Sequence, residues 1–120
     1  MPKLALGLLF ALLAGCAIQP ELASYPDAAP QIRRFYEQRA WELNATCTDP
    51  RIQTITAATV VEETPERLVL AVRYRYEPFN QTMEYGILSC KDWGERNFTF
   101  RKAGGTLQLE SMSGEQRRTR

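Results

Sequence analysis

The chain has 120 residues, which is room for one domain. Its 15 lysines and arginines nearly balance its 14 aspartates and glutamates, so we expect no nucleic-acid partner. It contains no histidine, which removes the most common general base and the most common metal ligand. We therefore expect no enzyme activity, no metal and no other cofactor.

The first residues have the parts of an export signal. Lys3 supplies a positive start, residues 4–13 are apolar, and small residues follow at 14 and 15. The alternative is a transmembrane helix. Only fifteen uncharged residues run from Leu4 to Ile18, whereas a helix that spans a bilayer needs about 20. We predict a signal peptide over residues 1–15.

Leu13-Ala14-Gly15-Cys16 resembles the lipobox of bacterial lipoproteins at all four positions. The resemblance implies cleavage before Cys16, diacylglycerol on its thiol, and acyl chains such as palmitate on the new amine. Several acyl chains give a durable lipid anchor in a membrane. Ala17, rather than Asp, resembles the outer-membrane sorting pattern of Gram-negative lipoproteins, so we expect a protein that faces the periplasm. An ordinary secretory signal with an incidental cysteine is the alternative.

Two cysteines remain, Cys47 and Cys90. An exported protein lives in an oxidising compartment, so we predict a disulfide bond between them. On the chain-entropy model it stabilises the fold by about 4 kcal/mol. Two buried free thiols or a redox-active pair are alternatives, although redox pairs usually show Cys-x-x-Cys spacing and these cysteines are 43 positions apart.

The rest of the chain divides into a tether, one domain and a tail. Residues 16–29 begin with the lipidated cysteine and are predicted to be flexible, because prolines lie among small and polar residues. Fully extended, such a tether reaches at most about 45 Å, which would let the domain stand clear of the headgroups. Residues 30–112 form the domain, and residues 113–120 are predicted to be a frayed basic tail.

An amphipathic helix is predicted from Pro30 to near Asn44, because apolar residues recur at a spacing of three or four. These apolar residues are Ile32, Phe35, Tyr36, Ala40 and Leu43.

The remaining pattern predicts strands. Leu68 to Tyr76 alternates most clearly between apolar and other residues, and Gly104-Gly105 signals a hairpin. Consecutive antiparallel pairing is the simplest topology, since no second helical pattern separates the strands. We predict an α+β fold, with one N-terminal amphipathic helix packed on a four- to five-stranded antiparallel β-meander. The other expected strands are Ile52–Glu62, Thr82–Cys90, Asn97–Arg101 and Thr106–Ser111.

Three arginines lie on one face of the strand that alternates most clearly: Arg67, Arg73 and Arg75. This face could meet lipid phosphates or an acidic partner. We favour the other interpretation, a solvated face with acidic residues such as Glu62 or Glu84 on neighbouring strands.

Two tryptophans could take part in recognition. Trp93 lies in an expected polar turn, Lys91 to Gly94, and is the better surface candidate. Trp41 lies beside the apolar stripe of the helix and is expected to be partly core.

Two functions remain. The first is a membrane-anchored envelope lipoprotein whose domain binds an envelope protein through a strand edge or Trp93, without catalysis. The alternative is a domain that binds a small ligand, or is weakly enzymatic, in a cavity between the helix and a curved sheet. This alternative depends on fold analogy.

Overall fold

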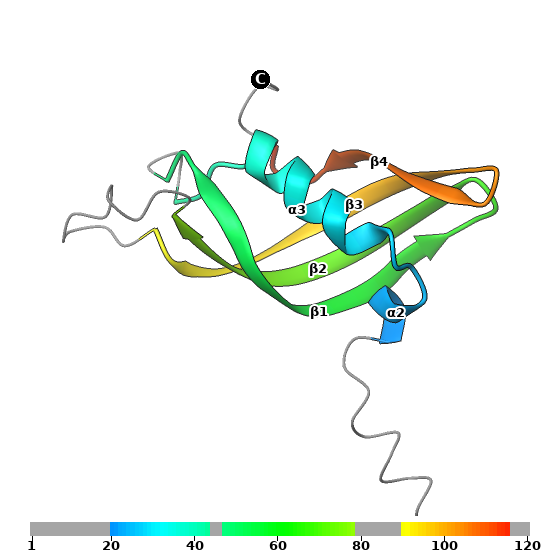
Figure 1. Cartoon of the computed structure of the whole chain (residues 1–120), viewed down its shortest axis with the longest axis horizontal. Helices are drawn as coiled ribbons and strands as arrows, with labels where there is room; N and C mark the ends of the chain where they lie inside the picture. The colour runs from blue at the N-terminus through cyan, green and yellow to red at the C-terminus, as the bar shows by residue number, and fades with distance from the viewer. Residues whose placement is uncertain (1–19, 44–46, 79–89, 116–120) are drawn as a thin grey trace, which may run out of the picture.

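A computed structural model describes residues 20–43, 47–78 and 90–115 (Figure 1). Four antiparallel strands form one sheet in the order β1-β2-β3-β4, which confirms the predicted α+β meander with its helix. Residues 82–89, where another strand was predicted, lie outside the described residues. The elements are α2 (Pro20–Ala23), α3 (Ala28–Arg39), β1 (Pro50–Glu63), β2 (Arg67–Pro78), β3 (Asp92–Ala103) and β4 (Thr106–Met112).

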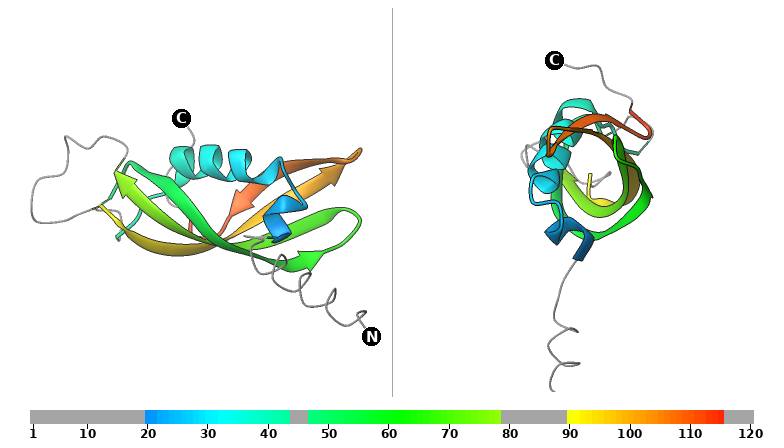
Figure 2. Two further views of the ribbon diagram at one scale, coloured as in Figure 1. Left: turned by 60° about the horizontal axis from the view of Figure 1, so that its bottom comes forward. Right: turned by 90° about the vertical axis from the view of Figure 1, so that its right-hand side faces the viewer.

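The sheet curls around an interior, and α3 lies along its open side (Figure 2). The register of β1 against β2 shifts at three places, and such bulges bend and twist a strand. Inward side chains pair across the strands, as Leu68 does with Phe100 and Leu70 with Phe98. All four are fully buried, so the core fills the concave side of the sheet.

Side chains of helix α3 bond to main-chain groups of both edge strands. The Gln31 side chain donates to the Leu107 carbonyl of β4 at 2.9 Å and accepts from the Leu109 amide at 2.8 Å. On the opposite edge, Arg33 donates to the Ile52 carbonyl of β1 at 2.9 Å. These bonds occupy edge groups that would otherwise be free to pair with another strand.

The helix prediction was wrong at both ends. Helix α3 begins at Ala28 and ends at Arg39, because Ala40 is already extended. The tether prediction was also wrong for residues 20–29, where Ala28 is fully buried and Leu22 packs against the core. Prolines suggested a linker there, but Pro20 and Pro30 lie in the first turns of α2 and α3, where a missing N–H costs nothing.

The tail prediction was wrong for residues 113–115. The Ser113 amide donates to the Asn97 carbonyl at 2.8 Å, which holds this turn on β3. Residues 116–120 lie outside the described part of the chain. Within the described ranges, no helix is long and apolar enough to cross a membrane.

Candidate interaction surface

The three residues predicted to form an interaction surface lie together on the outer face of the sheet: Arg73, Arg75 and Trp93. Trp93 lies directly opposite Arg75 in the β2–β3 register, and Arg73 lies opposite Glu95. The predicted turn at 91–94 was wrong for Asp92 to Gly94, because these residues pair with β2 as the start of β3. The Trp93 side chain is nevertheless 56 % exposed.

Arg75 differs from the other arginines of this face in what it contacts. Its guanidinium carbon lies 5.7 Å from the centre of the Trp93 ring, within the range of a cation–π contact. Arg73 pairs instead with Glu95 at 3.8 Å, and Arg67 pairs with Glu62 at 3.1 Å. Among the described residues, no carboxylate forms an ion pair with Arg75.

A surface pocket of about 540 Å³ lies beside the tryptophan and is lined by Thr56, Ala57, Arg73 and Trp93. Thr56 is the extra residue at one of the bulges in β1, and its hydroxyl donates to the Arg73 carbonyl at 3.1 Å. We call these four residues together with Arg75 the Trp93 surface. It presents an apolar ring, two cations and a shallow recess.

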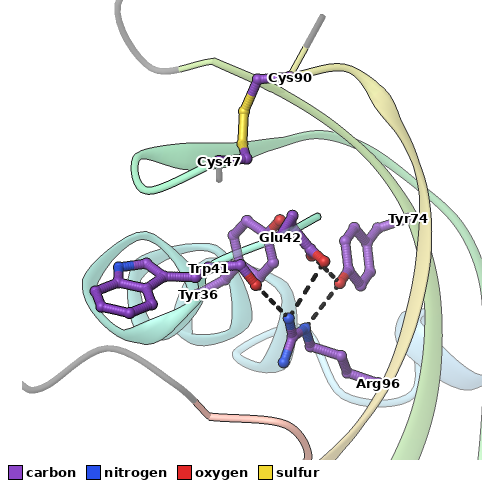
Figure 3. The surroundings of a disulfide bond; sticks show 7 residues. All are labelled: Tyr36, Trp41, Glu42, Cys47, Tyr74, Cys90 and Arg96. Atoms are coloured by element: carbon purple, nitrogen blue, oxygen red, sulfur yellow. Dashed lines mark hydrogen bonds and ion pairs between the residues drawn. A yellow bond between two sulfur atoms is a disulfide. The ribbon is translucent and has the colours of Figure 1, made fainter. Parts of the chain in front are cut away.

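Sequence reasoning missed a buried polar cluster on the inner face of the sheet (Figure 3). Arg96 lies at its centre and is only 9 % exposed. A guanidinium has five N–H groups, and each one here has an acceptor. Arg96 donates to the Tyr74 hydroxyl at 2.8 Å, to the carbonyls of Ser113, Gly114 and Trp41 at 2.8, 2.6 and 2.9 Å, and pairs with Glu42 at 3.3 Å.

Glu42 completes the cluster. Its second carboxylate oxygen accepts hydrogen bonds from the hydroxyls of Tyr36 at 2.7 Å and Tyr74 at 2.5 Å. Burial raises the pKa of both tyrosines far above the usual value, so they remain neutral donors. Burial opposes the charge on Arg96, but Tyr74 and Glu42 outweigh that effect and raise its pKa. The cluster therefore joins the segment after α3, both central strands and the C-terminal turn.

The alternation of β3 contained a signal for this cluster. Arg96 shares the inward parity of Phe98 and Phe100, and a buried cation requires hydrogen-bond partners. The convergent Glu, Tyr and Arg side chains also resemble what a ligand cavity would show. Here, however, these groups bond to one another and to the main chain.

The cysteines lie next to the cluster. Cys47 and Cys90 form a disulfide with Cα atoms 5.6 Å apart, in line with the predicted pair (Figure 3). Cys47 also exchanges main-chain hydrogen bonds with Glu42 at 2.9 and 3.0 Å. The disulfide thus holds the segment that carries Glu42 against the start of β3.

The other candidates are separate from the Trp93 surface. Trp41 is half-buried and contributes its carbonyl to Arg96. Cys16 and Glu84 lie outside the described residues. In the described part of the chain, no group of histidine, cysteine or acidic residues could hold a metal ion.

The chain gives no match to any protein-family model, curated protein or solved structure.

Proposed function

We propose that the protein is an exported lipoprotein, anchored in the outer membrane through acyl chains on Cys16 and facing the periplasm. The Leu13–Cys16 motif and an apolar run too short to span a bilayer support this proposal. A disulfide between Cys47 and Cys90 fits the same oxidising compartment.

The folded domain binds another envelope protein through the Trp93 surface and does not catalyse a reaction. The observation that carries this proposal is a tryptophan more than half exposed, with Arg75 at its ring. Tryptophan and arginine are among the side chains that contribute most binding energy at protein interfaces. A strand edge is a less suitable binding site, because Gln31 and Arg33 bond to the main chain of both edges.

The partner carries an acidic, partly apolar segment. Among the described residues, Arg75 has no carboxylate partner, whereas Arg67, Arg73 and Arg101 each have one on the same sheet. A segment that brings a carboxylate to Arg75 and an apolar side chain to the pocket beside Trp93 would complete both contacts.

The anchor is tested with Cys16→Ser. This substitution should abolish incorporation of labelled palmitate and release the protein from membranes. Wild type that takes up no label, or a Cys16→Ser protein that still fractionates with membranes, would contradict the lipid anchor.

The binding surface is tested by photo-crosslinking in intact cells. The photoreactive residue benzoylphenylalanine replaces Thr54, which lies opposite Arg75 in the sheet. We expect one protein adduct of defined mass, lost when Trp93→Ala or Arg75→Glu is added. Thr106, at the start of β4, is the matched control position. An adduct that survives both substitutions, or that forms equally from position 106, would contradict the proposal.

A further inference from the structure

The Trp93 surface and the N-terminal segment lie at opposite ends of the domain. Strand β3 runs from Asp92 beside the disulfide to Ala103 at the β3–β4 turn. Ten residues of strand separate Trp93 from that turn, so the two lie at most about 33 Å apart. The β1–β2 turn at 64–66 lies at the same end as the β3–β4 turn, and α2 lies beside β1 in the same half of the domain (Figure 1).

Helix α2 and the residues after it are attached to this end, which we call the hairpin end: residues 64–66, residues 104–105 and α2. Tyr25 donates to the Glu63 carboxylate at 2.5 Å, and Lys102 donates to the same oxygen at 2.8 Å. Leu22 packs against the core. A pocket of about 400 Å³ is lined by Ser24 and Tyr25 together with residues of both turns. The chain therefore has a fixed point close to Pro20.

Only residues 17–19 separate Cys16 from α2. Four peptide steps span at most about 14 Å, compared with about 45 Å for the longer tether that the sequence suggested. A lipidated Cys16 lies at the headgroup level of the bilayer, so Pro20 cannot move far from that surface.

We propose that the hairpin end faces the phospholipid headgroups and that Trp93 stands farther out, by at most about 33 Å along β3. This inference rests on the proposed lipid anchor. In this orientation, the envelope partner binds at a defined height above the membrane surface.

The charges at the hairpin end indicate what holds it there. In the strands next to the turns and in the β1–β2 turn, Glu62, Glu63 and Glu66 are balanced by Arg67, Arg101 and Lys102, and Glu21 in α2 adds one negative charge. Such a surface has no strong attraction for anionic lipid, so the short connection to Cys16 imposes the contact. The contact should therefore be insensitive to salt.

The test uses the full lipidated protein in vesicles of phosphatidylethanolamine and phosphatidylglycerol. Benzoylphenylalanine replaces Glu66 at the hairpin end or, in the matched control, Glu95 beside the Trp93 surface; both residues are exposed. We expect phospholipid adducts from position 66 and at least tenfold fewer from position 95, at low and high salt alike. Comparable adducts from both positions would mean that the domain lies flat, which would overturn the proposal.

Two further measurements separate this proposal from the anchor itself. Mass spectrometry of the N-terminal peptide reports lipid on Cys16; without it, both the anchor and the orientation are wrong. If Cys16 is lipidated but position 66 yields no adduct, the orientation alone is wrong. A flexible spacer of about ten residues inserted after Ala17 should remove the adducts from position 66. Undiminished adducts would contradict a contact imposed by the short connection.

Discussion

The ring of Tyr74 lies against Gly94, its direct partner across β2 and β3. A Cβ atom on Gly94 would lie 2.5 Å from the ring, closer than packed atoms can approach. The missing side chain therefore lets Tyr74 reach Glu42 and Arg96. Trp93, the residue before Gly94 in β3, lies on the opposite, outer face of the sheet.

Gly94→Ala should therefore displace Tyr74 and lower the free energy of unfolding by about 1–3 kcal/mol, the usual cost of overpacking. Chemical denaturation of the domain without its leader measures this change. Glu95→Ala is the matched control, because it removes only an exposed ion pair worth less than about 1 kcal/mol. Equal stabilities of Gly94→Ala and wild type would contradict the contact.

Arg96→Met should lower the free energy of unfolding by about 3–5 kcal/mol, because Glu42 and three carbonyls lose their buried cation. Arg73→Met, which breaks an exposed pair on the outer face, should change stability by less than about 1 kcal/mol. Adding Glu42→Gln to Arg96→Met should recover part of the loss. If the two arginine substitutions cost the same, Arg96 is not the centre of a buried network.

Alkaline pH should destabilise the domain. Burial raises the pKa of Tyr36 and Tyr74, whereas tyrosines in the unfolded chain lose their protons near pH 10.0. Above that pH the unfolded chain binds fewer protons than the native protein, so stability falls as pH rises. Each tyrosine contributes about 1.4 kcal/mol per pH unit.

Urea unfolding between about pH 9 and 12 measures this slope. Tyr36→Phe should reduce this slope by the contribution of one tyrosine, about 1.4 kcal/mol per pH unit, whatever the substitution does to stability at neutral pH. A stability that is unchanged above pH 10 would show that the hydroxyls ionise normally in the folded protein.

Removing the disulfide with Cys47→Ser and Cys90→Ser together should cost about 4 kcal/mol on the chain-entropy model. Thiol alkylation provides a separate check on protein that lacks the leader and Cys16. Unreduced, denatured protein should show no free thiol. Alkylation of both cysteines in that sample would mean that the pair does not form.

Much of the fold was predictable from local signals. The alternation in β2 identified its buried face, and Gly104-Gly105 identified the last hairpin, where both glycines have positive φ values that other residues adopt only at a cost. The same alternation placed Arg73 and Arg75 on the outer face. The alternation of apolar residues in strands and the identity of turn residues are local properties of the sequence, so they can be recognised without knowledge of tertiary contacts.

The features that the sequence did not predict depend on contacts between residues far apart in the chain. Glu42 and Arg96 meet only because the chain after α3 crosses the end of the curved sheet, which no local pattern indicates. Pro20 and Pro26 suggested a linker, although Leu22 and Tyr25 pack on the domain. A Lys-Asp-Trp-Gly segment suggested a turn, but Asp92 to Gly94 pair with β2.

Trp93→Ala tests the central claim, that the outer face serves recognition and not stability. The measurement compares its free energy of unfolding and its adduct yield from position 54 in cells with those of the wild type. We predict a stability within about 0.5 kcal/mol of wild type, as for an exposed residue, together with loss of the adduct. A loss of about 3–5 kcal/mol would mark Trp93 as a core residue, and an undiminished adduct would contradict its role in binding.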